Sequence, residues 1–293
     1  MMKVLVIGAS GLVGSHCLKF LKEKNIEAIG THRNYKVDNT FFFDPLLDNC
    51  FGFLSEIKFM PDVIIHCGAL TNVDYCEQNH DESYILTVMS TEIVTNFCKE
   101  NKIKLIYLST DYVFDGLDGP YLETSCRNPI NIYGVHKMES EKIVEESGNY
   151  IIARITNVYG EEARSKNFVA HLIKAVNSGI EKTFNLPFDQ FATPIYAGDI
   201  AKMIYFLIIE NKHGIYNLSS TDYLSRYQLA ARVVSYFSSS HLNIVPISSK
   251  SLQQQAMRPL NGGLLNVKFS NEFPNFEYTN IDKFISKTIY NGI

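Results

Sequence analysis

Residues 3–14, KVLVIGASGLVG, decide the fold of this 293-residue chain. The apolar run at 4–7 is typical of a parallel strand that is covered on both faces. Gly8, Gly11 and Gly14 follow at every third position. Glycine is needed where a strand turns tightly into a helix, where the backbone approaches a pyrophosphate, and where the helix packs closely on the strand. The stretch therefore predicts a βαβ unit that binds a dinucleotide.

The spacing of this turn is G-x-x-G-x-x-G, and its position at the start of a complete strand, turn, helix and strand makes it specific. The second strand begins near Ile26. We expect the dinucleotide to contact residues on both sides of the glycines, namely Gly8, Ser10, Gly11, Leu12, Val13 and Gly14.

The end of the second strand predicts the choice of nicotinamide cofactor. An acidic side chain there would accept hydrogen bonds from the ribose of NAD, whereas arginine favours the 2′-phosphate of NADP. This chain has Thr31, His32 and Arg33, and Asp38 comes too far along. We predict NADPH as cofactor, with NADH left open, with Arg33 at the phosphate and His32 among the cofactor-binding residues. The alternative is a solvated loop arginine.

Two later strand ends should also border the cofactor. A third strand at 41–43 ends at Asp44-Pro45, which suits either an adenine contact or simple capping of a following helix. A fourth strand at 61–66 leads into small residues that let a ribose approach the backbone, unless they form a plain loop. The predicted contacts are Asp44, Pro45, Cys67, Gly68, Ala69, Leu70, Thr71 and, on the next strand, Leu108.

The string STDYVFDG at 109–116 follows a fifth apolar strand at 103–110. Polar residues at the carboxyl end of such a strand face the ligand crevice of an open α/β sheet. Tyr133 and Lys137 come next, one turn apart on a helix that begins near 129–131. A tyrosine hydroxyl titrates near 10 when unperturbed, so we expect Lys137 to lower the pKa of Tyr133. Thr110 can then bind the carbonyl oxygen that Tyr133 protonates.

Composition excludes several other classes. No apolar run approaches the roughly 20 residues of a spanning helix, and the N-terminal run is too short for a signal peptide. Six cysteines without C-x-x-C spacing predict reduced thiols in the cytoplasm and no metal site. A net charge of −4 without a basic block argues against a nucleic-acid partner. We therefore expect a small-molecule substrate and no membrane.

Together, the glycine turn, the STDYVFDG string and the Tyr133/Lys137 pair resemble the extended short-chain dehydrogenase/reductase family, in its dTDP-4-dehydrorhamnose reductase-like group. The similarity continues through Arg154, Val158-Tyr159-Gly160, Asn167-Phe168, Asp189-Gln190, Thr193-Pro194 and Arg258-Pro259-x-Asn261. The resemblance implies that Thr110, Tyr133 and Lys137 are catalytic. It also places a nucleotide sugar near Asp111, Asn157, Asn167, Gln190 and Arg258.

The resemblance predicts an NADPH-dependent oxidoreductase that reduces a nucleotide-linked 4-keto-6-deoxy sugar, with Tyr133 as the proton donor. Two alternatives stay open: an epimerase or dehydratase that uses the cofactor without net turnover, and a non-catalytic regulatory subunit similar to the regulatory partner of methionine adenosyltransferase.

This chain departs from the reductase pattern at three places. Thr87 stands where the reductases usually carry asparagine, Asn157 replaces a tryptophan after Arg154, and Gly262 replaces a serine after Asn261. The identity of the sugar therefore stays open.

The predicted fold class is α/β, with a Rossmann-type doubly wound parallel sheet and a smaller mixed α/β C-terminal substrate-binding region. We place the NAD(P)-binding domain at 1–155 and the substrate-binding region at 156–293, with 196–219 packing back onto the sheet. Helices are expected at 77–101, 168–176 and 197–209, and strands at 216–218 and 243–245. Arg258 offers a fork for a diphosphate, or is a solvated loop arginine. A homodimer is compatible with the sequence.

Overall fold

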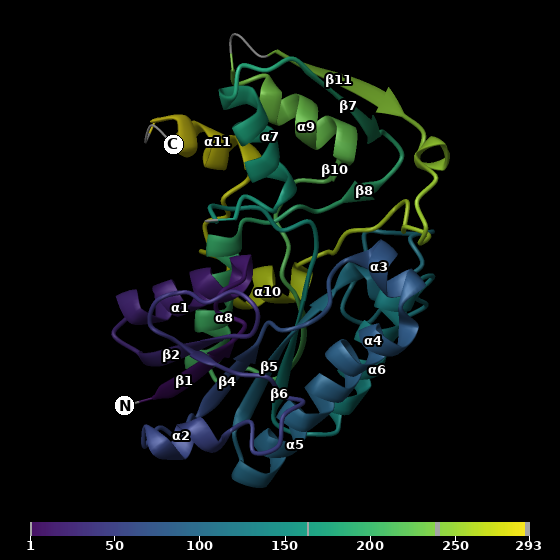
Figure 1. Ribbon diagram of the computed structural model, residues 1–293. Helices are drawn as coiled ribbons and strands as arrows, with labels where there is room; N and C mark the ends of the chain where they lie inside the picture. The colour runs from purple at the N-terminus through teal and green to yellow at the C-terminus, as the bar shows by residue number, and fades with distance from the viewer. Residues whose placement is uncertain (1, 163, 238–240, 291–293) are drawn as a thin grey trace.

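A seven-stranded parallel sheet forms the larger part of the molecule (Figure 1). The computed structural model describes residues 2–162, 164–237 and 241–290. The strand order is β3-β2-β1-β4-β5-β6-β9, and every neighbouring pair is parallel. This order reverses between β1 and β4, the place where doubly wound sheets open a ligand crevice. The predicted α/β fold is confirmed.

The strands of this sheet are short. They are mostly buried because helices cover both faces of the sheet. Their bounds are β1 Lys3–Ile7, β2 Glu27–His32, β3 Thr40–Phe42, β4 Val63–His66, β5 Lys104–Thr110, β6 Tyr150–Ile155 and β9 Gly214–Asn217.

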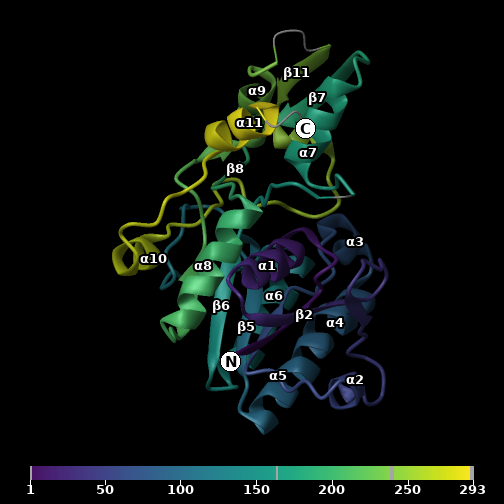
Figure 2. The same cartoon turned by 90° about the vertical axis from the view of Figure 1, so that its left-hand side faces the viewer.

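Two apolar clusters divide the core between the faces of the sheet. On one face, β1, β4, β5 and β6 pack against α1 (Leu12–Glu23) and α8 (Ala197–Ile209), which lie side by side in Figure 2. On the other face the same strands pack against α2 (Gly52–Glu56), α5 (Ser90–Asn101) and α6 (Ile132–Glu145). Residues of the C-terminal half therefore complete the sheet, because α8 covers it and β9 extends its edge.

The helical stretch expected at 77–101 is confirmed from residue 80 to residue 101, but it is not one regular α-helix and it is interrupted at Asn79. The chain forms α3 (Val73–Gln78), then α4 (His80–Tyr84), a π-helical turn (Ile85–Met89) and α5. Hydroxyl groups bond to backbone carbonyls around this turn: Ser90 donates to Leu86 O at 2.7 Å and Thr91 to Thr87 O at 2.6 Å. Such local bonds compete with the regular helical ladder, which a periodicity of apolar residues does not reveal.

The smaller part of the molecule lies above the carboxyl ends of the sheet strands in Figure 1. It has its own apolar core between helices and two small two-stranded sheets, one parallel and one antiparallel. Its elements are α7 (Phe168–Asn177), β7 (Lys182–Pro187), β8 (Phe191–Ala192), β10 (Leu224–Ser225), α9 (Arg226–Val234), β11 (Leu242–Ile247) and α11 (Ile281–Tyr290). Before α11, α10 (Val267–Glu272) returns to β9.

None of the helices in the described part of the chain is both long and apolar enough to cross a lipid bilayer.

Candidate functional site

A cleft of about 670 Å³ opens where β1, β4, β5 and β6 end and the smaller part of the molecule begins. It gathers most of the residues that the sequence predicts for cofactor and substrate. They are Gly8, Ser10, Gly11, Leu12, Val13, Gly14, Arg33, Cys67, Gly68, Ala69, Thr71, Leu108, Thr110, Asp111, Tyr133, Lys137, Asn157 and Asn167. An adjoining cavity of about 220 Å³ shares Gly8 and Arg33 and adds Asp44, Pro45 and Leu70.

The glycine turn forms one wall of the cleft, and two of its positions require glycine. A Cβ on Gly14 would lie 2.4 Å from the carbonyl oxygen of Gly8, and Gly8 itself has φ +80°. Helix α1 can therefore start directly against β1, with its first backbone N–H groups facing the cleft. The donors and the open backbone fit the pyrophosphate of a dinucleotide.

Arg33 and Asp44 meet across the ends of β2 and β3. The Arg33 Nε lies 2.8 Å from Asp44 Oδ2, and Asp44 Oδ1 also accepts a hydrogen bond from Leu46 N at 3.2 Å. Asp44 thus caps the following turn as well as lining the cavity. This bond uses Nε, and no residue in the described ranges bonds to the outer nitrogens of Arg33, so these can bind a phosphate.

The structure does not bring His32 into either cavity. Its buried ring packs on Phe42, and Nδ1 lies 2.8 Å from the Thr40 hydroxyl. Thr31, which the sequence analysis did not single out, lines the cavity instead and accepts a hydrogen bond from Gly8 N at 3.2 Å. Side chains alternate between the faces along β2, so only one of these two neighbours can face the glycine turn.

Tyr133 and Thr110 come together at the centre of the cleft. Asn131 caps α6 by accepting a hydrogen bond from Gly134 N at 2.8 Å, which fixes the turn that carries Tyr133. Burial raises the pKa of Tyr133 well above its ordinary value of 10.0, and the neighbouring Thr110 side chain only partly offsets that effect. Tyr133 therefore keeps its proton at neutral pH.

Lys137 is buried in the first turns of α6, with 3% of its surface exposed. Its ammonium donates to Leu108 O at 2.5 Å and lies 4.0 Å from the centre of the Tyr107 ring. The expected lowering of the Tyr133 pKa by Lys137 is not seen, because desolvation of the phenol dominates. The lysine instead holds the end of β5 against α6.

Asp111 lines the cleft, but its carboxylate accepts hydrogen bonds from other groups of the protein. Thr156 donates to Oδ2 at 2.8 Å and Gly263 N donates to the same oxygen at 3.1 Å. Burial raises the pKa of Asp111, while these hydrogen bonds lower it in part. Asp111 thereby joins the end of β5 to the loop before α10.

The remaining residues predicted for the substrate separate into two groups. Asn157, with φ +41°, and Asn167, the N-cap of α7, line the cleft. Gln190 and Arg258 do not: Gln190 donates to Gln254 Oε1 at 3.0 Å, and both outer nitrogens of Arg258 bind the Asp74 carboxylate at 2.9 and 2.8 Å.

The cleft is also lined by two cationic side chains, Arg164 and Lys166, which the sequence analysis did not identify. Arg164 Nη2 donates to Ser10 O at 3.3 Å, and its guanidinium lies 5.0 Å from the Tyr35 ring. They belong to the loop before α7, which has no motif, so their position depends on tertiary structure alone.

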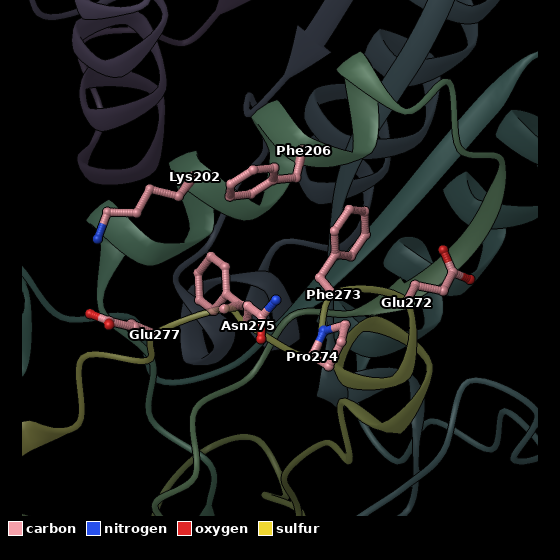
Figure 3. A pocket seen from close by; sticks show the side chains of 8 residues that line it. Lys202, Phe206, Glu272, Phe273, Pro274, Asn275 and Glu277 are labelled. Atoms are coloured by element: carbon pink, nitrogen blue, oxygen red, sulfur yellow. The ribbon is translucent and has the colours of Figure 1, made fainter.

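A separate cavity of about 380 Å³ lies away from the strand ends (Figure 3). Lys202 and Phe206 from α8 face residues 272–277, and the rings of Phe206 and Phe273 turn toward the same space. Apart from its apolar rings it offers a lysine and two glutamates near its edge, so it lacks the paired hydroxyls and glycine turn of the main cleft.

The comparisons with known proteins agree with this geometry. The family model described as RmlD substrate binding domain matches residues 2–287. Methionine adenosyltransferase 2 subunit beta of Bos taurus is 30% identical over 270 residues, which cover 89% of this chain and 80% of that protein.

Two solved structures of dTDP-4-dehydrorhamnose reductases also superpose on nearly the whole chain. The enzyme from Bacillus anthracis, solved in complex with NADP, has a TM-score of 0.86 at 27% identity and covers 99% of this chain and 100% of its own. The enzyme from Clostridium acetobutylicum has a TM-score of 0.84 at 27% identity, with 99% of both chains covered. The chain therefore belongs to the RmlD substrate binding domain family, whose reductase members share its Rossmann-type fold.

Proposed function

We propose that this protein is an NADPH-dependent reductase of a nucleotide-linked 4-keto-6-deoxy sugar. One observation carries the proposal: Thr110 and Tyr133 line the same cleft as a glycine turn that admits a dinucleotide. The resemblance of the whole chain to dTDP-4-dehydrorhamnose reductases, one of them solved with NADP, supports the choice of cofactor and substrate class.

The residues that would hold the cofactor fit its parts. The turn at 8–14 would face the pyrophosphate, Arg33 the 2′-phosphate, and residues 67–71 the ribose. When bound, the cofactor supplies the hydride that reduces the keto carbon. Asp44 holds Arg33 in place and borders the adenine side of the cavity.

The protein's own part in the reaction is to deliver a proton to the sugar oxygen. Tyr133 keeps its proton at neutral pH because it is buried, so it can donate to an alkoxide that forms beside it. Thr110 can donate a hydrogen bond to the same oxygen and stabilise the developing charge. Lys137, held on Leu108 O, keeps the end of β5 and helix α6 at a fixed separation. Binding the cofactor and the keto sugar together in attack geometry is worth roughly 7 to 11 kcal/mol of barrier in well-oriented reactions.

NADPH oxidation across a panel of dTDP-, GDP-, UDP- and CDP-linked 4-keto-6-deoxy sugars tests the proposal. We expect net, stoichiometric oxidation with at least one of them. Sugar rearrangement without net NADPH oxidation would identify an epimerase or dehydratase instead.

A second candidate is a regulatory subunit of a methionine adenosyltransferase, because relatives of that name reach 30% identity. Co-purification with a catalytic adenosyltransferase and a change in its rate, with no oxidation across the panel, would establish this role in place of the reductase.

A further inference from the structure

Arg226 differs from most other arginines of the chain because no carboxylate in the described part of the chain forms an ion pair with it. The sequence has seven arginines, and five of them, Arg33, Arg127, Arg154, Arg232 and Arg258, form ion pairs with Asp or Glu. Arg164 binds a backbone carbonyl. Among the described residues, the partner of the Arg226 guanidinium is the face of Phe168, 3.9 Å from the ring centre.

Arg226 does not itself line the cleft, but it contacts Phe168, the neighbour of the cleft residue Asn167 on the substrate side. Arg226 is the first residue of α9, and its backbone N–H donates to Gln190 O at 3.2 Å. Phe168, beneath the guanidinium, directly follows the cleft residue Asn167. Arg226 also neighbours the phenol of Tyr112, whose ring packs edge-on against Tyr133.

The surroundings of Arg226 disfavour the charged form of its guanidinium. Burial lowers the pKa of Arg226, and the nearby guanidinium of Arg258 lowers it further. An arginine that loses water without gaining a carboxylate lowers the stability of the fold unless a ligand compensates. An anion bound between Phe168 and Tyr112 would supply the missing partner.

The chemistry of the side chain indicates which anion fits. A guanidinium stacked on an aromatic ring keeps its N–H groups free at the edge, and these match two oxygens of a phosphate. Arg258, the sequence-based candidate for this role, already directs both outer nitrogens at Asp74. Asp74 therefore neutralises the charge of Arg258 and occupies both of its outer nitrogens.

We propose that Arg226 binds the diphosphate of the nucleotide-sugar substrate, and that Arg258 is a structural cation held by Asp74. This inference rests on the proposed function for the identity of the ligand. It assigns the diphosphate to the substrate side of the cleft, across from the glycine turn that faces the cofactor.

Calorimetric binding of dTDP and UDP to the full chain saturated with NADPH tests the proposal, with thymidine as the uncharged probe. In Arg226→Gln we expect the affinity for the better-bound diphosphate to fall at least tenfold, and any binding of thymidine to stay unchanged. Arg226→Lys should recover part of the affinity, because it restores the charge without the fork. The matched control is Arg232→Gln on the same helix, whose guanidinium is paired with Asp282 at 2.7 Å; it should bind as the wild type does.

A second readout separates binding from folding. Removing an unpaired, half-buried charge should leave the melting temperature of Arg226→Gln equal to or above that of the wild type, and its affinity for NADPH unchanged. Wild-type diphosphate affinity in Arg226→Gln would overturn the inference, as would an equal loss of NADPH affinity. Diphosphate binding that depends on Arg226 in a protein that reduces no keto sugar would uphold the inference while refuting the proposed reaction.

Discussion

Arg33 is the side chain on which the proposed choice of nicotinamide cofactor depends. Replacing it with glutamine removes a charged hydrogen-bond donor, a loss worth about 1.5 to 3 kcal/mol. We predict that KM for NADPH rises by roughly tenfold or more in Arg33→Gln, while KM for NADH changes little. Lys36→Gln, an exposed change on the same loop, is the control. An equal rise in both KM values would show that Arg33 does not read the 2′-phosphate.

Thr87 illustrates how one side chain can be understood only from the fold. Its hydroxyl is buried in the π-helical turn and has no hydrogen-bond partner among the described residues. An unsatisfied buried hydroxyl costs about 1 to 3 kcal/mol. We therefore predict that Thr87→Val raises the free energy of unfolding by about 1 kcal/mol, measured by urea denaturation. Thr91→Val, which removes the 2.6 Å bond to Thr87 O, should instead lower it.

At the scale of elements, the contact between β1 and α1 is the tightest one that the sequence predicts. A Cβ at residue 14 would meet Gly8 O at 2.4 Å and Ala9 Cα at 2.9 Å, both of them backbone atoms. We predict that Gly14→Ala lowers the free energy of unfolding by about 1 to 3 kcal/mol, as overpacking does, and weakens NADPH binding at least tenfold. Lys19→Ala, on the exposed side of the same helix, should change neither quantity. Unaltered NADPH binding in Gly14→Ala would mean that the turn is not the pyrophosphate site.

The elements that the sequence predicts well are those with a strong local signal. The apolar runs at 4–7 and 105–108 lie in strands at the centre of the sheet, and the apolar run at 197–209 coincides with α8. The local sequence pattern does not predict an element correctly where contacts with other residues determine where a helix begins or ends. Asn79 ends α3 with its side chain donating to Tyr75 O at 3.0 Å, so the apolar periodicity of 77–101 does not become one helix.

The residues of the candidate site also differ in how well the sequence predicts their positions in the whole molecule. The glycine turn, Thr110 and Tyr133 could be placed in one cleft because strand ends of a parallel sheet meet at the same edge. Arg258 could not, since its partner Asp74 is 184 residues away in the sequence. Arg164 and Arg226 carry no motif, and only tertiary packing brings Arg164 to the cleft and Arg226 onto Phe168, beside the cleft residue Asn167.

A buried charge network ties several elements of the molecule together, and it should govern acid stability. Glu141, fully buried on α6, binds Arg154 of β6 at 2.9 and 2.7 Å and Arg127 at 3.0 Å. Burial alone would raise the pKa of Glu141, but the hydrogen bonds from Arg154 outweigh it, so the pKa is lowered from its ordinary 4.5. A carboxyl with a lowered pKa in the folded state stabilises the protein above its unfolded pKa and loses that effect as the pH falls.

We predict that Glu141→Gln lowers the free energy of unfolding by about 3 to 5 kcal/mol at pH 7, because it leaves Arg154 buried without its counter-charge. The difference from the wild type should shrink as the pH falls from 5 toward 3. Urea denaturation at several pH values measures it. Glu145→Gln, at the half-exposed end of the same network, is the control and should cost less than about 1 kcal/mol. A difference that stays constant with pH would exclude the ionised Glu141 as the source.

The central claim is that Tyr133 donates the proton in a reductase. Its most direct test compares wild type and Tyr133→Phe for two quantities: the rate of NADPH oxidation with the keto sugar that the panel identifies, and the dissociation constant of NADPH. We predict that the variant loses at least 100-fold in rate, the lower end for general acid catalysis, while its NADPH dissociation constant stays within about threefold of the wild type, a change of under 1 kcal/mol. Wild-type oxidation by Tyr133→Phe would contradict the account.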